Sequence, residues 1–390
     1  MDLERLFYLL SLNVRGWETS TIIRIASRIG KIGTLSAFDV MALNNLADID
    51  RDIYDIFSDL AFATALNIKE VSKIYGEAIA REHKKAYFLY DYRKKPYVPF
   101  DENQRLQSMV KAFARTTGQT MQNLGATSAQ NIGIRDENGV FQPLRKFYSD
   151  TVDKAIMQVS SGVGDFHTAM RDSIKAMGGS GIVVDYGSGV TRRLDTVTRQ
   201  VMLHGMKDVN TQYMQDLADE LDCDGIEIDW HAHPRPSHEF MQGKQFILGK
   251  ARTINGKYYP SADQALERLQ DYNCYHFKTP IICGVSVPSF DNDELARLNA
   301  KEKKEYTIGN DTGTPYFWSQ QMRKLETGIR QEKQIKAAAR AAGDKDAVKA
   351  CNARIKAYKD KYTQITNTTG IDPEPIRMRI YPPKKSENMY

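Results

Sequence analysis

Residues 229–244 read DWHAHPRPSHEFMQGK, and further along the chain residues 273–276 read NCYH. Four of the seven histidines of the chain lie in these two segments. Pro234 and Pro236 each lack a backbone donor and hold the chain extended, so His238 and its neighbours are presented from a stiff backbone. Because prolines and glycines also stop helices and strands from continuing, the pattern predicts a compact polar loop system and not a spacer.

The composition is that of a folded protein. A chain of 390 residues with 41% hydrophobic residues is long enough for roughly two or three domains with ordinary cores. No apolar run approaches the roughly 20 residues that cross a bilayer, so we expect no membrane partner. The acidic residues Asp2 and Glu4 are atypical of a signal peptide, and the irregular spacing of the cysteines suits a reducing compartment. We expect synthesis in a cytoplasm.

The periodicity of the apolar residues predicts an α+β fold that is predominantly helical. Turn-rich stretches divide the helical parts from one short region of extended pieces. We expect a helical N-terminal domain (1–125), a linker (126–145), a helical middle region (146–221), a small α+β unit (222–290), a second linker (291–313), a basic helical hairpin (314–368) and a C-terminal strand and tail (369–390).

Short runs rich in β-branched or aromatic residues, bounded by glycine or proline, predict the strands. In the α+β unit the strands are expected at residues 226–229, 245–248, 257–259 and 281–287, around a helix at 262–272. Outside the unit, strands are expected at 182–186 and 376–381, and a helix is expected to begin near residue 192.

Two helical series near the C-terminus predict an antiparallel hairpin. Apolar residues recur at intervals of three and four, first from Trp318 to Ile329 and then from Val348 to Ile365. Between the two series, Gly343 is suited to end one helix and Asp344 to cap the next. The apolar faces can cover each other, so the charges of the hairpin are expected to remain outside.

The net charge of +5 belongs to this hairpin: residues 316–362 hold twelve Lys or Arg against five Asp or Glu. A solvated helix face, a protein surface and DNA are the alternatives. Acidic residues such as Glu326 and Glu332 lie among the basic ones, which favours docking on a protein with secondary DNA contact. The candidate contact residues are Arg323, Arg330, Arg340, Lys349, Arg354, Lys356 and Lys361.

The order of several motifs resembles the minor capsid protein 2 family of tailed bacteriophages, which is itself similar to the phage Mu F-like head morphogenesis proteins. The likeness extends from the N-terminal helices to the charged hairpin. At residue 275 the family has arginine where this chain has tyrosine. The motif residues that carry the likeness, and for which we expect a structural role, are Arg235, Pro236, Ser237, His238, Gln242, Gly243, Asn273, Cys274 and His276.

The resemblance implies a minor capsid protein in the virion of a double-stranded DNA phage, inside the head and near the portal, acting in head morphogenesis and in DNA packaging or ejection. Residues 222–290 would form the Mu F-like core. The implied partners are the portal protein and, further, the major capsid or scaffolding protein, with nonspecific contact to packaged DNA. The resemblance brings no catalytic activity and no cofactor.

The residues of the loops leave alternatives open. We expect Arg235 and His238 to donate hydrogen bonds to backbone carbonyls, and we expect no metal. Because imidazole and thiolate are the usual zinc ligands, a metal site is the alternative, and with it a metal-dependent or toxin-like enzyme. A nucleophilic pair of Cys274 and His238 lacks an assignable orienting residue. The candidate metal ligands are His231, His233, His238, Cys274 and His276.

Overall fold

The computed structural model describes residues 3–34, 46–64, 68–126, 130–136, 138–161, 166–271 and 274–381. Helices dominate these ranges and the sheets are small and antiparallel, which confirms the predicted α+β, predominantly helical fold class. None of the helices in the described ranges combines the length and the apolar character needed to cross a bilayer.

The chain divides into two compact units that are each assembled from distant segments. The first unit comprises Met1–Leu66, Gln119–Val201 and Met322–Tyr390, and the second comprises Asn67–Gly118 and Met202–Gln321. This division cuts across the consecutive domains expected from the sequence. Local periodicity predicts where a helix forms, but the packing partners of that helix depend on contacts far along the chain.

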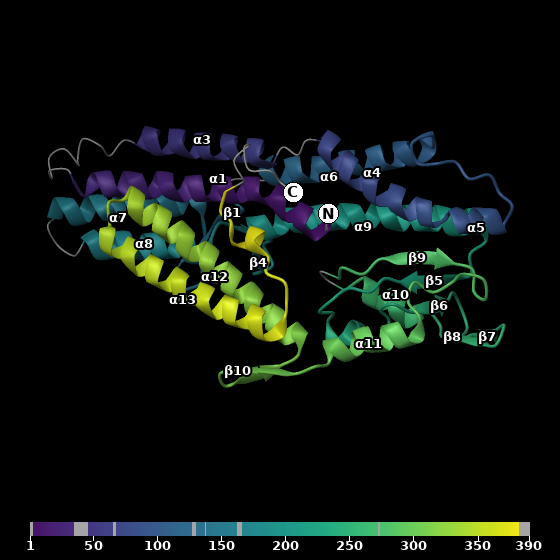
Figure 1. The fold of residues 1–390 in the computed structure, drawn as a ribbon. Coiled ribbons are helices and arrows are strands. Elements are labelled where there is room, and N and C mark those ends of the chain that lie inside the picture. Colours follow the sequence, from purple (N-terminus) through teal and green to yellow (C-terminus); the bar gives the residue numbers. More distant parts are fainter. Residues whose placement is uncertain are drawn as a thin grey trace. The chain divides into compact units, whose positions relative to one another are not determined.

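The first unit is built around its N-terminal helix. Helix α1 (Leu3–Ile32) contacts α3 (Leu46–Thr64), α7 (Leu144–Ser161) and α8 (Phe166–Ser180), as Figure 1 shows. Apolar side chains from all four helices, among them those of Ile25 and Tyr148, form one buried cluster. This cluster is the core of the unit, since burial of apolar surface is the main favourable contribution to folding.

A four-stranded antiparallel sheet in the order β2-β1-β3-β4 completes the first unit. The predicted linker 126–145 is therefore wrong in part, because it contains two paired strands. Its turn residues close a hairpin, in which Asp136 Oδ1 accepts hydrogen bonds from the backbone of Asn138 and Val140. The strands are β1 (Ile132–Arg135), β2 (Phe141–Pro143), β3 (Val183–Asp185) and β4 (Thr191–Arg193), and β4 stands where a helix was expected to begin.

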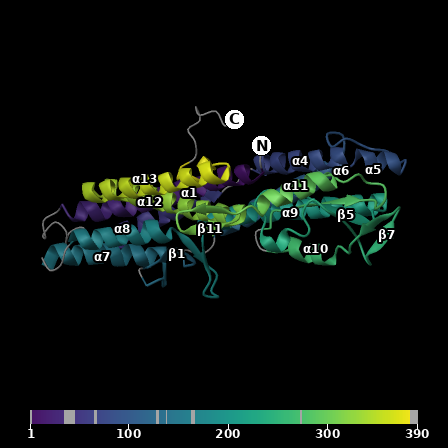
Figure 2. The same ribbon diagram turned by 60° about the horizontal axis from the view of Figure 1, so that its bottom comes forward.

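Helices α12 (Pro315–Ala341) and α13 (Lys345–Thr369) form the predicted hairpin. They lie side by side in Figures 1 and 2. The aromatic ring of Tyr358 packs against Gly328, since a Cβ added to that glycine would lie 3.0 Å from the ring. Gly343 has a φ of 81° and the Asp344 side chain accepts from the backbone of Ala347, as expected of a helix end and an N-cap.

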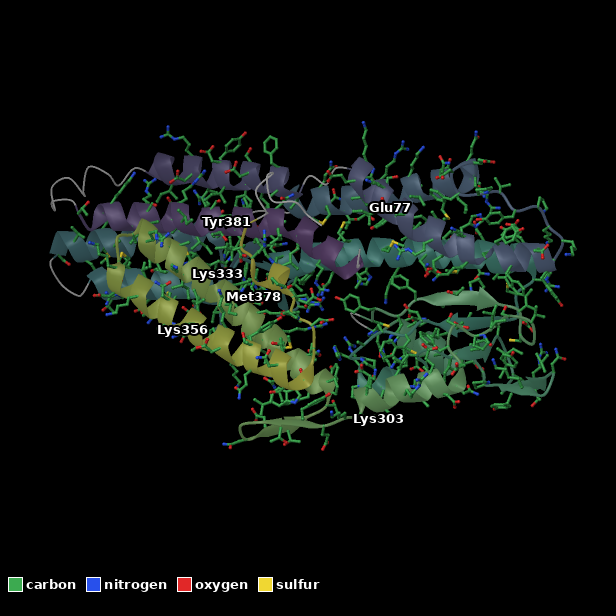
Figure 3. The ribbon with its side chains drawn as sticks, viewed as in Figure 1. Glu77, Lys303, Lys333, Lys356, Met378 and Tyr381 are labelled. Atoms are coloured by element: carbon green, nitrogen blue, oxygen red, sulfur yellow. The ribbon has the colours of Figure 1, made fainter. Side chains whose placement is uncertain are left out.

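The C-terminal strand predicted at residues 376–381 is wrong. The segment forms a 3₁₀ turn, η2 (Pro375–Met378), and residues 382–390 lie outside the described ranges. Arg330 Nη1 donates to the carbonyl of Arg377 at 2.6 Å, and Lys333 Nζ donates to that of Met378 at 2.6 Å (Figure 3). Side chains of α12 thus satisfy the carbonyls that a strand would have paired with a neighbouring strand.

The second unit includes the helices α4 (Ile68–Lys85), α5 (Tyr87–Tyr92), the first part of α6 (Gln104–Ala126) and most of α9 (Leu194–Leu221). The hydroxyl of Tyr75 lies 3.1 Å from Thr117 Oγ1 and donates to the carbonyl of Met202 at 3.1 Å. A Cβ on Gly205 would lie 2.1 Å from Thr117 Oγ1, so only glycine allows α9 this close to α4 and α6.

The second unit also holds a three-stranded antiparallel sheet in the order β6-β5-β9 and a separate hairpin of β7 and β8. The strand expected at 281–287 instead spans residues 278–281. It can include Pro280 because β9 is an edge strand, where proline is tolerated. The bounds are β5 (Gly225–Ile228), β6 (Gln245–Ile247), β7 (Arg252–Ile254), β8 (Lys257–Tyr259), α10 (Asp263–Leu269) and β9 (Lys278–Ile281).

The second linker predicted, at residues 291–313, is also wrong. It holds α11 (Asn292–Glu302) and a hairpin of β10 (Tyr306–Ile308) with β11 (Asp311–Gly313). Asp291 caps α11 by accepting from the backbone of Glu294 at 2.7 Å. The polar composition that suggested a linker belongs to an exposed capped helix and an exposed hairpin.

A buried ionic network crosses the first unit at the carboxylate of Glu18, which is 1% exposed. Its Oε1 accepts from the backbone of Ile182 at 2.6 Å, and its Oε2 accepts from Gln334 Nε2 at 2.9 Å. Arg193 Nη2 lies 3.3 Å from Oε1. Three donors from two distant segments of the chain therefore meet at one carboxylate.

We predict that the buried ion pair next to this network is much more sensitive to substitution than an exposed pair. Arg15 Nε donates to Asp195 Oδ2 at 2.7 Å, and both side chains are at most 4% exposed. Burial alone would raise the pKa of Asp195, yet the neighbouring guanidinium groups hold it below its ordinary value. Asp195→Asn should lower the free energy of unfolding by about 3–5 kcal/mol in urea denaturation, because it leaves buried guanidinium charge uncompensated.

The matched control is Asp50→Asn, which makes the same change in the exposed pair of Asp50 and Arg145. Exposed pairs contribute at most about 1 kcal/mol, so this variant should unfold near the wild-type midpoint. Equal losses in the two variants would contradict the role given to burial.

Candidate functional site

The two polar segments singled out in the sequence lie at the same end of the sheet in the second unit. The central strand β5 has Glu227 opposite Gln245 of β6 and Ile228 opposite Lys278 of β9. The loop that follows β5 and the segment that precedes β9 therefore lie at one end of β5. The loop includes a single 3₁₀ turn, η1 (Pro236–His238), with Pro236 at its first position.

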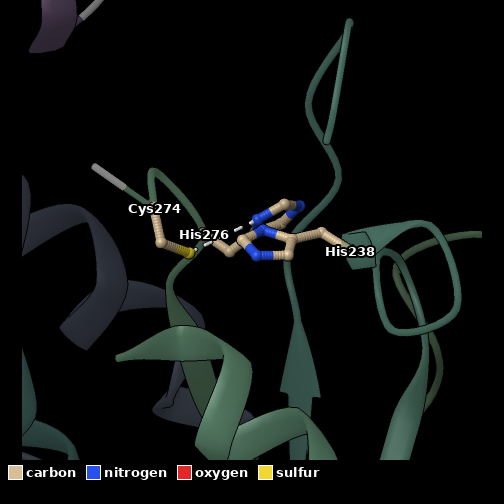
Figure 4. A group of neighbouring side chains, drawn as sticks. All are labelled: His238, Cys274 and His276. Atoms are coloured by element: carbon tan, nitrogen blue, oxygen red, sulfur yellow. Dashed lines mark hydrogen bonds between the residues drawn. The ribbon is translucent and has the colours of Figure 1, made fainter. Parts of the chain in front are cut away.

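Three of the predicted side chains meet there, as Figure 4 shows. His238, Cys274 and His276 each offer one ligand atom, and these atoms lie within 4.8 Å of one another. Cys274 Sγ is 3.7 Å from His276 Nδ1. All three side chains are at most 2% exposed, so the group is shielded from solvent.

A carboxylate that the sequence analysis did not single out orients His238. The ring Nε2 of His238 lies 2.9 Å from Asp271 Oδ2, so the expected hydrogen bond from His238 to a backbone carbonyl is not the one formed. Asp271 comes three residues before Cys274 and carried no signal of its own in the sequence. Asp271 is part-exposed, and the hydrogen bond from His238 lowers its pKa.

Gln242 and Gly243 pack the loop against neighbouring elements. The Gln242 side chain is fully buried, with its amide 3.1 Å from both Trp230 Nε1 and the carbonyl of His231, so it accepts from the indole and donates to the carbonyl. His276 Nε2 lies 3.5 Å from the same amide. Gly243 has a φ of 69°, and a Cβ there would lie 2.5 Å from Leu295 Cδ1.

The remaining predicted residues are placed differently. The His231 ring lies against that of His276, with centroids 4.1 Å apart. His233 points elsewhere, since its backbone N and its Nδ1 lie 2.9 and 3.3 Å from Glu302 Oε2. Arg235 is half-buried, Pro236 and Ser237 are exposed, and Asn273 lies outside the described residues.

The protonation of the group suits a ligand better than a nucleophile. Burial, followed by the nearby charges of His231 and His238, lowers the pKa of His276 to about 2, so its imidazole is neutral. Burial raises the pKa of the Cys274 thiol. An activated cysteine needs a depressed pKa and access to substrate, neither of which Cys274 has. A neutral imidazole beside a thiol instead forms hydrogen bonds or ligates a metal ion.

Fold and site together define a predominantly helical α+β protein with histidine and cysteine side chains buried at one end of a small sheet. The chain belongs to the phage minor capsid protein 2 family, whose sequence profile matches residues 15–367, and this confirms the resemblance seen in the motifs. Neither a curated protein nor a solved structure is similar enough to the chain to count as a match. Its role is that of a structural protein of phage particles.

We predict that Asp229 makes the stability depend on pH. Asp229 Oδ1 accepts from the backbone of Phe277 at 2.8 Å, and burial raises the pKa of the carboxyl to about 7. The folded state keeps this proton to a higher pH than the unfolded chain does, so the stabilisation is complete below about pH 4 and lost as the pH rises through about 7. The melting temperature should therefore fall between about pH 5 and pH 8.

Asp229→Asn keeps the acceptor oxygen, so it should raise the melting temperature at about pH 8 and reduce the slope. Part of the slope should remain, because burial also raises the pKa of Glu326 to about 7. Asp224→Asn serves as the control, since Asp224 likewise accepts from a backbone N–H, that of Cys283 at 2.7 Å, but is more exposed. A wild-type slope in Asp229→Asn would refute the assignment.

Proposed function

We propose that this protein is a minor structural component inside the phage head, near the portal, where it takes part in head morphogenesis and in the packaging or ejection of DNA. Membership of the phage minor capsid protein 2 family supports the structural role. The portal protein is the principal partner we propose, with the major capsid or scaffolding protein as further partners. The protein acts by binding and not by catalysis, a proposal supported by the burial of Cys274.

The charges of the hairpin indicate which surface would bind. Two of the seven cations expected outside have partners inside the first unit: Arg330 is 9% exposed and donates to the Arg377 carbonyl, and Arg354 Nε pairs with Glu332 at 2.6 Å. These two hold the fold together and are poor candidates for contact with a partner. The other five, Arg323, Arg340, Lys349, Lys356 and Lys361, are exposed, and Arg354 is also exposed although it is paired.

The single observation that carries the proposal is a lysine stripe on α13, which consists of Lys345, Lys349 and Lys356. These residues are four and seven positions apart, so they share one face of the helix, and all three are exposed. Lys356 is labelled on α13 in Figure 3. The buried face of α13 carries Cys351, Tyr362 and Ile365, on another side of the helix. The stripe is therefore free of the core of the unit.

Three of the five acidic residues that argued against DNA contact are buried, whereas Asp346 and Asp360 are exposed. Glu326 is 3% exposed and accepts from the Tyr362 hydroxyl, and Asp344 is 8% exposed and pairs with Arg171. Glu332 pairs with Arg354. The outer face of the hairpin is thus more basic than its composition indicates. We propose that the lysine stripe contacts the phosphates of packaged DNA while other surfaces dock on the portal.

We predict that the full chain binds duplex DNA of arbitrary sequence and that Lys349→Glu with Lys356→Glu weakens this binding. Removing one lysine–phosphate interaction should reduce the slope of log K against log salt by about 0.9, so the double variant should have a slope smaller by about 2. Titration by fluorescence anisotropy at several salt concentrations measures this.

The control is Lys111→Glu with Arg115→Glu, which makes the same change in charge on an exposed face of α6. It should keep most of the wild-type salt slope. If the slope falls equally in both double variants, the binding follows net charge and the stripe has no special part in it.

We further predict that the protein is found in purified virions at low copy number and is retained by immobilised portal protein. Docking on a protein face buries apolar surface, so retention should persist at a salt concentration that abolishes DNA binding. Mass spectrometry of particles and a portal pull-down with nuclease-treated protein test this. Absence from mature particles would replace the virion role with a role in assembly alone.

A further inference from the structure

The group of three buried side chains in the second unit has the donor set of a zinc site, and its ligand atoms lie close to the spacing that zinc requires. Thiolate and imidazole are the ligands that zinc prefers, and a tetrahedral ion with ordinary bond lengths holds its sulfur and nitrogen ligands about 3.3–3.6 Å apart. Cys274 Sγ and His276 Nδ1 are already 3.7 Å apart, and the His238 ligand atom lies within 4.8 Å of both. Small side-chain rotations would bring the three onto one ion.

The other nitrogen of each ring faces a polar side chain, as is usual for histidines that ligate metals. His238 Nε2 contacts the Asp271 carboxylate at 2.9 Å, which fixes the proton on Nε2 and leaves Nδ1 as the nitrogen that can bind an ion. His276 Nε2 lies 3.5 Å from the Gln242 amide, while its Nδ1 faces the Cys274 sulfur. His238 thus has an orienting carboxylate of the kind that metal-ligating histidines usually have, and His276 turns its Nδ1 toward the cysteine sulfur.

The position of the group explains what an ion would contribute. His238 ends the single turn η1, whereas Cys274 and His276 belong to an irregular segment before β9. Strands of three or four residues hold these two loops at one end of the sheet. An ion bound only by the folded chain would cross-link the two loops, so its binding free energy would add directly to the free energy of folding.

We propose that His238, Cys274 and His276 bind a structural zinc ion that joins the two loops at the end of the β6-β5-β9 sheet. Three protein ligands leave one position of the tetrahedron for a water molecule. Because all three ligands are buried, a bulky substrate cannot reach that position, so the ion serves to stabilise the fold. His231 and His233 are not ligands, since the first lies against the His276 ring and the second binds Glu302. The site is independent of the function proposed for the hairpin.

The test uses the full chain purified without chelator. Elemental analysis should find about one zinc ion per chain, and removal of zinc should lower the melting temperature, which zinc should then restore. Cobalt added to the zinc-free protein should produce a thiolate-to-cobalt charge-transfer band. Cys274→Ser should lose that band and reduce the zinc content at least tenfold. Cys283→Ser changes another buried cysteine of the same unit and should retain both.

A second variant keeps the test decisive if Cys274→Ser does not fold. The triple variant Cys223→Ser, Cys283→Ser and Cys351→Ser leaves Cys274 as the one thiol of the chain, so its cobalt band can come only from that residue. Presence of the band in the folded triple variant supports the site. Folded wild-type protein with neither stoichiometric zinc nor a cobalt charge-transfer band would overturn the proposal, and so would a band that Cys274→Ser retains.

Discussion

The carboxylate of Glu18, in the N-terminal segment of the first unit, receives hydrogen bonds from the other two segments of that unit. It lies on α1, and its donors are the backbone of Ile182 before β3, the guanidinium of Arg193 and the amide of Gln334 on α12. A buried charge without one of these donors would cost several kcal/mol, so the three segments are stable only when they are assembled together. This requirement explains why residues so distant in the sequence form one unit, and why the hairpin of α12 and α13 belongs to it.

The cost of burying an unpaired charge also explains why the charges of the hairpin form two groups. Arg330, Glu326 and Arg377 lie inside, where they tie η2 to α12 and α13 through hydrogen bonds and ion pairs. Lysines of α13 remain outside because a long flexible side chain with a strongly hydrated ammonium group is better solvated than buried. The outer face of the hairpin is therefore more basic than the hairpin as a whole. A basic face is what binding to nucleic acid would require.

In the second unit, the central strand β5 brings distant segments of the chain together. Because β6 and β9 pair with opposite edges of β5, the loops that carry the histidines and cysteine are brought to one end of the sheet. Burial there keeps His276 neutral by lowering its pKa and raises the pKa of the Cys274 thiol. Prolines stiffen the loops, and the side chains that they hold form a donor set suited to a metal ion. The same burial makes Cys274 unsuited to act as a reactive thiol.

The sequence by itself determined what depends on neighbouring residues. The helices of the hairpin, the Asp344 cap and the family follow from periodicity, from local hydrogen bonding and from motifs in order. Tertiary structure alone decided which side chains meet across the chain. Asp271 beside His238, the inward turn of Arg330 and the pairing of β1 with β3 depend on contacts between distant residues. The η2 turn differs from the predicted strand for the same reason, since strand pairing needs a partner that no local pattern specifies.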